Sequence, residues 1–444
     1  MLKIALESLG CSKNLVDAEI MMGILNEKGY KLTGSFEDAD VILVNTCGFI
    51  ESAKQESIQT ILEFAQLKET GNLKLLIVTG CLAQRYADEL KEEIPEIDAI
   101  VGTGSYQNID EILAELSEKH QIVSLNNIEF AYDENLPRYV STPSHMAYLK
   151  IGEGCDNKCT YCIIPKIRGK FRSRLEKNIL DEVNLLVNNG VKEIILIAQD
   201  LTDYGVDIYG KRMLHDLVRK ISLIDGVEWI RLLYCYPEEI TDELIEEIAN
   251  NDKVVKYLDL PIQHISSKVL KQMGRRTNKE TIIDKIETLR NKVPNIALRT
   301  SLIVGFPGET EEEFNELATF LKDYKLENVG VFAYSQEEDT PAAIMDGQIE
   351  ENIKKERQNT LMAIQRDVVK EQIKLKIGNI YDTIIDSNNG EYFIGRNYEM
   401  APEIDGLIYI KKHDGLSIGD IIKVKVTDVM EYDLIGEIFD ELSK

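Results

Sequence analysis

The stretch Cys155-Asp-Asn-Lys-Cys159-Thr-Tyr-Cys162 places three thiols within eight residues, directly after a short apolar segment at 146–151. A structural zinc site has four ligands, commonly in two C-x2-C pairs, and a two-cluster ferredoxin has a fourth cysteine followed by proline. The sequence matches neither pattern. A four-iron cluster held by only three thiolates would leave one iron open to a substrate or cosubstrate. The spacing therefore predicts an open iron-sulfur site, and the alternative is a chance cluster of structural cysteines.

The composition is that of an ordinary globular protein. The chain of 444 residues has room for two or three domains, and 44% of its residues are hydrophobic. No apolar run approaches the roughly 18 residues of a membrane-spanning helix, and the N-terminus lacks a signal-peptide pattern. These features predict a cytoplasmic protein without a membrane partner. Six of the seven cysteines fall into two sets of three, which suits metal ligation, and the seventh, Cys235, is expected to be inert core.

The charge balance limits the choice of partner. The chain has 77 acidic against 51 basic residues, which gives a net charge of −26. Proteins that bind nucleic acid gain affinity by neutralising phosphates with Lys and Arg, so this charge argues against direct nucleic-acid binding. A basic protein is the better matched partner, unless the acidity serves solubility alone.

Residues 1–124 alternate apolar segments with amphipathic ones, which predicts a parallel sheet covered by helices on both faces. Cys11, Cys47 and Cys81 each follow the end of a predicted strand, and in an open parallel sheet these ends share one edge. We therefore predict that the three thiolates converge as ligands of a second, auxiliary 4Fe-4S cluster. The alternative is three independent buried cysteines. The expected strands are 2–7, 41–45, 75–79 and 99–102, and the expected helices are 14–28, 52–67 and 84–90.

A barrel is predicted after a linker. Residues 125–143 are polar, contain two prolines and show no period, which is typical of a linker. Beyond them, six apolar segments alternate with helical patterns, and six consecutive βα units predict a partly open (β/α) barrel with its active residues at the carboxyl ends of the strands. The predicted strands are 146–151, 193–198, 229–234, 257–262, 296–305 and 329–335.

Polar residues follow several of these strands. Gln199 and Asp200 come after the second, and His264 after the fourth. Asp200 and His264 are candidate catalytic residues, and satisfied polar groups at a barrel rim are the alternative. Gly305 and Gly308 follow the fifth strand in a turn that opens an acid-rich helix. Because glycine lets the backbone approach a flat ligand, we expect this turn to line a cosubstrate, although a simple Pro-Gly helix entry would look the same.

The C-terminal region is rich in short strands. Five of them within about 65 residues, after a helical stretch at 341–372, predict a small antiparallel barrel. They are 379–385, 391–396, 407–410, 421–429 and 433–438. The predicted domains are therefore 1–124, the linker 125–143, the barrel with its connecting helix at 144–372, and the terminal barrel at 373–444.

The two cysteine sets, the six-unit barrel and the terminal β-barrel together resemble the methylthiotransferase branch of the radical S-adenosylmethionine (SAM) enzymes, over nearly the whole chain. Within this branch the chain is most similar to the type that adds a methylthio group to the β-carbon of an aspartate in small-subunit ribosomal protein twelve. The sister family that modifies tRNA adenosine usually differs after Cys47 and Cys162. The stretches that carry the similarity are 9–17, 44–54, 162–174, 334–341 and 401–406.

This resemblance implies a flavodoxin-like N-terminal domain with the auxiliary cluster, a radical SAM barrel, and a C-terminal TRAM domain that recognises substrate. It also implies two molecules of SAM per turnover. One methylates sulfur held at the auxiliary cluster, and the other is cleaved at the cluster of Cys155, Cys159 and Cys162 to a radical that takes hydrogen from the substrate. A sulfur source and an electron donor, such as a flavodoxin or ferredoxin, are needed as well. The residues expected to bind SAM are Tyr161, Gln199, Gly305 and Gly308.

The charge distribution favours a protein substrate. From Lys376 to Lys444 there are 7 basic and 14 acidic residues, a net charge of −7, which suits a basic ribosomal protein, free or on the small subunit, better than tRNA. The basic stretch 158–174 differs. Its cations balance cluster charge, or they contact the substrate carboxylate through Arg168, Arg172 and Arg174, or they touch RNA. Two other functions stay open, namely tRNA adenosine methylthiolation and a redox-sensing or binding iron-sulfur module.

Overall fold

A computed structural model of the chain describes residues 2–439 except 117, 120, 131–135 and 414. The chain forms two compact units. The first comprises Met1–Ser141, Gly152–Arg174 and Ser335–Ala343, and the second comprises Thr142–Ile151, Leu175–Tyr334 and Ile344–Lys444. Both cysteine sets therefore belong to the first unit. Among the described helices, none has the length and apolar character needed to cross a membrane.

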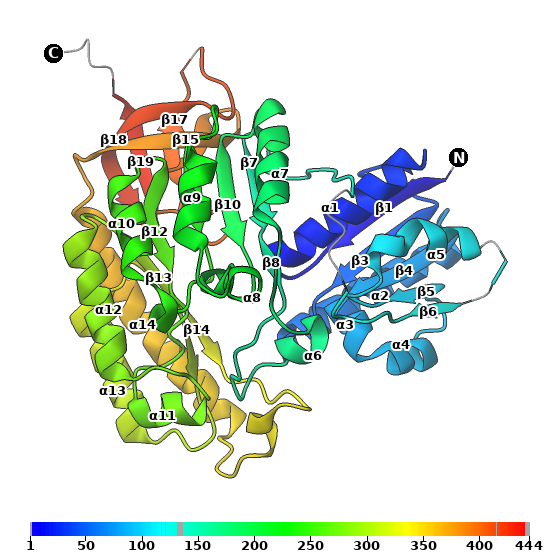
Figure 1. The fold of residues 1–444 in the computed structure, drawn as a ribbon, viewed down its shortest axis with the longest axis horizontal. Helices are drawn as coiled ribbons and strands as arrows, with labels where there is room; N and C mark the ends of the chain where they lie inside the picture. The colour runs from blue at the N-terminus through cyan, green and yellow to red at the C-terminus, as the bar shows by residue number, and fades with distance from the viewer. Residues whose placement is uncertain (1, 117, 120, 131–135, 414, 440–444) are drawn as a thin grey trace. The chain divides into compact units, whose positions relative to one another are not determined.

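The first unit is built on a sheet of six parallel strands, which are β1 (Lys3–Ser8), β2 (Lys31–Leu32), β3 (Val41–Thr46), β4 (Leu75–Gly80), β5 (Ala99–Val101) and β6 (Ile122–Ser124). Their order is β2-β1-β3-β4-β5-β6 (Figure 1). The three strands that precede cysteines, β1, β3 and β4, are thus neighbours. The short edge strands β2 and β6 were not predicted from the sequence.

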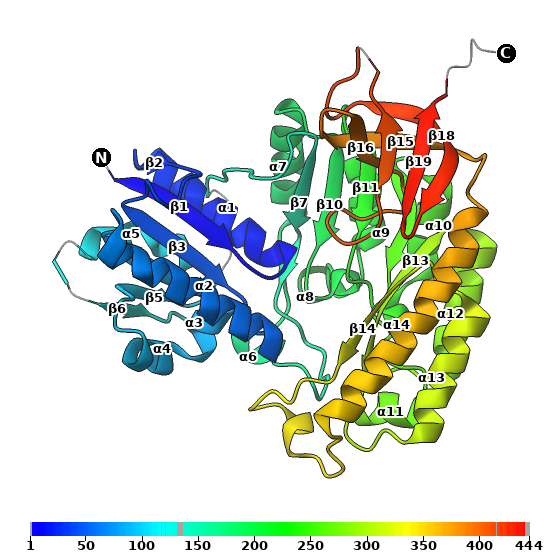
Figure 2. The same cartoon turned by 180° about the vertical axis from the view of Figure 1, so that it is seen from behind.

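Helices cover both faces of this sheet. They are α1 (Ser12–Glu27), α2 (Glu51–Thr70), α3 (Cys81–Arg85), α4 (Ala87–Glu93) and α5 (Ile109–Glu115), with a 3-10 turn, η1, at Tyr106–Asn108. Side chains at alternate positions of β3, Ile42 and Val44, pack with Ile61 of α2 and Leu90 of α4 in one buried core. Helices α1 and α5 contact each other and lie over the opposite face (Figures 1 and 2). The predicted flavodoxin-like fold is confirmed, and the helix predicted at 84–90 is divided into α3 and α4.

Two segments from later in the chain complete the first unit. Residues 152–174 form a loop that is closed by the antiparallel pair β8 (Gly152–Glu153) and β9 (Arg172–Ser173) and contains the short helix α6 (Ile164–Arg168). Residues 335–343 are held by Glu337, a buried carboxylate 2.8 Å from Nη1 of Arg85 and 3.0 Å from Nζ of Lys54. The N–H of Ala342 also donates to the carbonyl of Thr160, at 2.9 Å.

The predicted linker is fixed to α1 where the structure describes it. The buried carboxylate of Glu19 lies 2.6 Å from Nη2 of Arg138 and accepts the N–H of Ser141, also at 2.6 Å. Two charge-assisted contacts to one buried carboxylate hold this segment in a defined position. Residues 131–135 of the predicted linker lie outside the described residues.

The second unit begins with a sheet of six parallel strands, β7 (Met146–Lys150), β10 (Glu193–Ile197), β11 (Trp229–Leu232), β12 (Val254–Asp259), β13 (Ala297–Val304) and β14 (Asn328–Ala333). The order β14-β13-β12-β11-β10-β7 is open, which confirms the predicted partial barrel. Each strand from the sequence analysis is found within a few residues of its predicted limits. Apolar runs buried on both faces explain this agreement for β7, β10 and β11, whereas β13 and β14 are only partly buried.

Helices surround this sheet, and α14 lies along β14 (Figure 2). They are α7 (Glu176–Asn188), α8 (Val206–Tyr209), α9 (Leu214–Ser222), α10 (Asp242–Asn250), α11 (Ser267–Gln272), α12 (Lys279–Lys292), α13 (Glu311–Tyr324) and α14 (Glu351–Lys374), with 3-10 turns η2 (Leu201–Asp203) and η3 (Pro237–Glu239). A further 3-10 turn, η4 (Pro341–Ile344), lies almost wholly in the segment 335–343 of the first unit. The start of α13 shows how the sequence sets an element. Thr310 and Glu313 exchange hydrogen bonds in a capping box, so the helix begins directly after Thr310.

A closed five-stranded barrel completes the second unit, with strands β15 (Ile380–Asn388), β16 (Tyr392–Arg396), β17 (Ile408–Lys411), β18 (Ile421–Met430) and β19 (Asp433–Ile438) in the order β15-β16-β17-β19-β18. The five strands were predicted, and so was the barrel. It is antiparallel except between β17 and β19, which pair in parallel. Strand directions depend on the path of the connections, which short strand patterns do not determine.

Buried ion pairs join this small barrel to the larger one. Glu193 of β10 receives hydrogen bonds from Arg231 of β11 at 2.8 Å and from Arg396 of β16 at 2.7 Å. Arg396 also binds Asp386 of β15, at 2.7 and 2.9 Å, and Asp386 lies 2.8 Å from Nε2 of His145. Glu193, Arg231 and Arg396 are each at most 1% exposed. The two β structures of this unit therefore share one ionic core.

Candidate iron-sulfur sites

The three cysteines of the N-terminal sheet lie on adjacent loops. Cys47 directly follows β3, Cys81 directly follows β4 as the first residue of α3, and Cys11 immediately precedes α1. Gly10 shows how closely two of these loops approach. Its φ is +89°, and a Cβ there would stand 2.7 Å from Cβ and 3.0 Å from Sγ of Cys47. The predicted shared edge is thus present, and glycine is required where the first two loops meet.

Two asparagines hold these loops together. Asn14 of α1 donates to the carbonyls of Thr46, at 2.9 Å, and Leu9, at 3.1 Å, while Asn45 of β3 donates to the carbonyl of Asn14, at 2.6 Å. Oδ1 of Asn14 lies 3.7 Å from Sγ of Cys81. Asn14 therefore contacts all three loops. The sequence analysis missed this role, although Asn14 lies inside the motif at 9–17.

The electrostatics of these thiols fit a cationic cofactor. Burial, together with the nearby thiols of Cys81 and Cys11, raises the pKa of Cys47 to about 12. Burial also raises the pKa of Cys81, against the opposing effect of Arg168. Three thiolates this close need a positive core between them, as iron or another metal supplies.

A single metal ion and a four-iron cluster place different demands on the spacing of three thiolates. Among residues 2–439 that the structure describes, no group of three or more His, Cys, Asp or Glu side chains is placed to hold one metal ion. With metal–sulfur bonds of about 2.3 Å, a single ion needs its sulfurs within roughly 4.6 Å of one another. A four-iron cluster places each thiolate on a different iron and so tolerates a wider spacing. The auxiliary cluster at Cys11, Cys47 and Cys81 stays a prediction.

Gly10→Ala is expected to reduce the iron content of the auxiliary site. A side chain there would collide with Cys47, and left-handed backbone costs a non-glycine residue about 1–2 kcal/mol in addition. Gly29→Ala is the matched control, because Gly29 has φ +86° with no atom within 4 Å of the added Cβ. Iron analysis after anaerobic reconstitution measures the effect. Equal iron in the two variants would contradict the proposed crowding.

The second set of cysteines lies in the loop between β8 and β9. Cys155 and Cys159 are buried and Cys162 is half-buried. The N–H of Cys155 donates to the carbonyl of Gly169 at 3.1 Å, and Nδ2 of Asn157 lies 3.5 Å from Sγ of Cys155. At Gly154, φ is +80° and a Cβ would stand 2.1 Å from the carbonyl oxygen of Lys170. The loop is therefore tightly folded around its first cysteine.

Arg168 at the end of α6 links this loop to the auxiliary set. Its Nη2 lies 3.4 Å from Sγ of Cys81 and 2.5 Å from Oδ1 of Asn14, and its Nη1 lies 2.5 Å from Oδ2 of Asp17. Arg168 is 3% exposed, and Asp17 is equally buried. Of the roles considered for this cation, these contacts favour charge balance over binding a substrate carboxylate. Sequence reasoning did not identify Asp17 as its partner.

The other residues of this loop that are predicted to bind substrate or SAM do not share the contacts of Arg168. Arg172 is half-buried, donates to the carbonyls of Lys170 and Arg168, and lies over the ring of Phe130 at 5.7 Å. Arg174 is buried, and Tyr161 is half-buried. Their roles in binding substrate or SAM stay predictions.

Asp200 and His264 of the second unit have structural contacts. Asp200 is fully buried, and its Oδ1 accepts from N–H and Oγ1 of Thr202 at the start of η2. Nδ1 of His264 accepts the N–H of Ser266 at 2.9 Å, so the proton of the neutral ring is on Nε2, for which no described residue is an acceptor. Burial lowers the pKa of His264 to about 3. Asp200 is therefore a satisfied polar group, whereas the buried Nε2–H of His264 is not satisfied by a described residue. The catalytic roles of both residues stay predictions.

The turn with Gly305 and Gly308 uses its backbone internally. Oε2 of Glu309 accepts the N–H of Gly305 at 2.5 Å and of Phe306 at 3.1 Å, and Gly308 donates to the carbonyl of Gly347. Glu309 is in turn held by Arg357, at 3.0 Å. These contacts support the alternative of a helix entry. Gln199, which follows β10, is half-buried.

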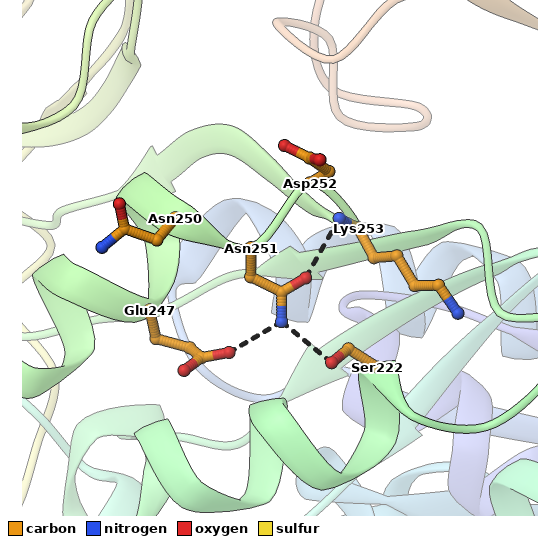
Figure 3. A pocket seen from close by; sticks show the side chains of 6 residues that line it. All are labelled: Ser222, Glu247, Asn250, Asn251, Asp252 and Lys253. Atoms are coloured by element: carbon orange, nitrogen blue, oxygen red, sulfur yellow. Dashed lines mark hydrogen bonds between the residues drawn. The ribbon is translucent and has the colours of Figure 1, made fainter.

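The second unit has two hollows that are lined by other residues. One, of about 400 Å³, is lined by Ser222, Glu247, Asn250, Asn251, Asp252 and Lys253 (Figure 3). Asn251 there donates to Glu247 and Ser222 and accepts from the N–H of Lys253. These hydrogen bonds hold the loop after α10 in place. The other, of about 470 Å³, lies where β13, β14, α14 and the small barrel meet. None of the predicted site residues lines either hollow.

Three family profiles match successive parts of the chain. An uncharacterized protein family, UPF0004, matches residues 3–102, the radical SAM superfamily matches 149–321, and the TRAM domain matches 377–439. These matches fall on the N-terminal sheet, the larger barrel and the small barrel, in the predicted order.

Relatives of similar length support one family. A protein of Clostridioides difficile strain 630, named ribosomal protein uS12 methylthiotransferase RimO, is 60% identical over 444 residues, covering all of both chains. A protein of the same name from Clostridium acetobutylicum is 54% identical and covers all of this chain and 99% of its own. The aligned length includes every element described above.

Solved structures with low sequence identity show the same fold. TsrM of Kitasatospora setae, a radical SAM methyltransferase, aligns with a TM-score of 0.55 at 14% identity, covering 78% of this chain and 75% of its own. OxsB, a cobalamin-dependent SAM radical enzyme, aligns with a TM-score of 0.52 at 13% identity, covering 84% of this chain and 56% of its own. At such identity the likeness concerns the fold alone.

Proposed function

The chain belongs to the family of ribosomal protein uS12 methylthiotransferases, and on this premise we propose that it transfers a methylthio group to the β-carbon of an aspartate in uS12. The observation that carries the proposal is the meeting of the two cysteine sets in one unit. Arg168, six residues after Cys162, donates to Sγ of Cys81 at 3.4 Å. A reaction that combines radical formation with sulfur transfer needs its two centres held together in this way.

Each set of three cysteines would bind its own cluster. Cys155, Cys159 and Cys162 would hold the radical SAM cluster, and Cys11, Cys47 and Cys81 would hold the auxiliary cluster. When bound, the clusters and SAM supply the radical, the methyl group and the sulfur. The protein contributes position and exclusion of water. Cys155, Cys159 and Cys81 are buried and would shield bound clusters from solvent, and the Asn14 contacts fix the auxiliary loops.

The acidic C-terminal barrel supports a basic protein as substrate. The region from Lys376 to Lys444 has a net charge of −7, which would repel tRNA and attract a basic ribosomal protein. Methylthiolation of tRNA adenosine is therefore the disfavoured alternative. We also propose a cytoplasmic location, where ribosomal substrate is available, and a flavodoxin or ferredoxin as electron donor.

Mass spectrometry of uS12 and of tRNA nucleosides, with and without the enzyme, tests the substrate. We expect a mass increase on one uS12 aspartate and unchanged tRNA adenosine. The free protein and intact small subunits are compared in the same series, because either form could be recognised. Modified adenosine with unmodified uS12 would contradict the proposal.

Release of 5′-deoxyadenosine separates the enzyme from a non-enzymatic iron-sulfur module. The full chain is reconstituted anaerobically with iron and sulfide and then given dithionite and SAM. We expect 5′-deoxyadenosine from the wild-type chain and none from a Cys155→Ala, Cys159→Ala, Cys162→Ala variant. Equal background release from both chains would favour a redox-sensing or binding module.

A further inference from the structure

We propose that Arg168 is a positioning residue of the auxiliary cluster, which hydrogen-bonds the Cys81 thiolate and raises the reduction potential of that cluster. The inference rests on the proposed function, because it takes Cys11, Cys47 and Cys81 as cluster ligands. It concerns an arginine that belongs by sequence to the other cysteine set. Through Arg168, the loop that carries Cys155, Cys159 and Cys162 would influence the reduction potential of the auxiliary cluster.

The contacts of the guanidinium define this role. Nη2 points to Sγ of Cys81, at 3.4 Å, and to Oδ1 of Asn14, at 2.5 Å. Nη1 is held by Asp17, at 2.5 Å, and lies 3.4 Å from Oε2 of Glu153. With 3% of the residue exposed, water does not screen these interactions. The carboxylates thus fix the guanidinium at Nη1, while Nη2 is directed at the sulfur of Cys81.

The backbone around Arg168 is fixed as well. Ile167 is fully buried and packs with Ile163 and Cys81, and its carbonyl accepts from Oγ1 of Thr103 at 2.6 Å. Gly169 has φ +74°, which ends α6 directly after the arginine. A side chain anchored on both sides loses little further entropy when it binds a cluster ligand.

The physical effect follows from charge. Reduction adds an electron to a cluster that already bears thiolates, and hydrogen bonds to sulfur and nearby cations stabilise the added charge. Arg168 supplies both, so its loss should lower the potential. Asp17 opposes it by placing a negative charge at the far edge of the same guanidinium. Removal of that negative charge should raise the potential, which gives two substitutions with effects of opposite sign.

The experiment measures the potential of the auxiliary cluster alone. The full chain with Cys155→Ala, Cys159→Ala and Cys162→Ala serves as the parent, so that only one cluster is bound. Arg168→Gln, Arg168→Lys and Asp17→Asn are each made in this parent. Iron is counted, and the fraction reduced is followed by EPR during anaerobic titration with dithionite. Arg172→Gln is the matched control, because it removes the same charge from the same loop and its described contacts are backbone carbonyls and a ring.

We expect Arg168→Gln to move the potential to more negative values, Asp17→Asn to move it to more positive values, and Arg168→Lys to fall between Arg168→Gln and the parent. Arg172→Gln should stay near the parent. If Arg168 were merely structural, its variants would lose iron while the remaining cluster kept the parental potential, and this result would overturn the inference. If the Arg168→Gln variant binds no iron, the test rests on the Asp17→Asn variant. A reduction potential of that variant equal to the potential of the parent would overturn the inference. A parent that binds no iron would instead overturn the assignment of Cys11, Cys47 and Cys81.

Discussion

Replacing Cys47 by alanine is expected to leave reductive cleavage of SAM near the wild-type rate while methylthiolation of uS12 falls by more than about 100-fold. The cleavage depends on the cysteines at 155–162, which this variant retains. Cys47 lies on the auxiliary edge and is a proposed ligand there. Loss of an outer-shell partner alone costs about 10–100-fold at metal sites, so loss of a ligand should cost more. Quantifying 5′-deoxyadenosine and modified uS12 in one reaction measures both activities.

Cys235→Ala is the control for this variant. Cys235 is fully buried in the second unit and belongs to neither cysteine set, so its loss should preserve both products. Cys155→Ala should abolish both, because no radical forms. Normal amounts of methylthiolated uS12 from the Cys47→Ala enzyme would contradict a two-cluster mechanism.

The largest effect on stability is expected from Glu193→Gln. The substitution keeps the shape of the side chain but leaves Arg231 and Arg396 buried with too little negative charge. Removing one partner from a buried ionic group costs about 3–5 kcal/mol. Trp229, the single tryptophan, lies two residues from Arg231 in β11, so its fluorescence during urea unfolding reports this unit.

The loss should also depend on pH. Burial would raise the pKa of Glu193, but attraction to Arg396 and Arg231 prevails and lowers it from 4.5 to about 2. A carboxylate with a lowered folded-state pKa stabilises the protein above pH 4.5, and this contribution disappears as the pH falls towards 2. The difference between wild type and Glu193→Gln should therefore shrink over that window.

A surface pair provides the control for this experiment. Glu176→Gln breaks a partly exposed contact of 2.8 Å with Lys220 and should cost under about 1 kcal/mol. A Glu193→Gln variant no less stable than Glu176→Gln would contradict the proposed ionic core.

Much of this architecture follows from local patterns. Buried parallel strands such as β3 and β10 each contain a run of four apolar residues, and such runs are visible in the sequence without any long-range information. The convergence of Cys11, Cys47 and Cys81 followed from one topological rule, that parallel strands end at a common edge. It required no knowledge of side-chain contacts.

The contacts that tune the site could not be predicted in this way. Arg168 and Asp17 are 151 residues apart, and no periodicity indicates that they pair. The assignment of residues 335–343 to the first unit likewise depends on Glu337, which meets Lys54 and Arg85 from a distant part of the chain. Sequence patterns describe which face of an element is buried, but partners across such distances are decided by the assembled fold.

The way the chain is shared between the two units limits how the protein can be dissected. It passes from one unit to the other after residues 141, 151, 174, 334 and 343. A recombinant fragment of residues 1–124 would lack Arg168 and Glu337, and would leave the buried groups of Asp17 and Lys54 without these counter-ions. A single proteolytic cut would release neither unit whole. Truncation is therefore unsuited to assigning functions to the units, and point substitutions in the intact chain are the appropriate tool.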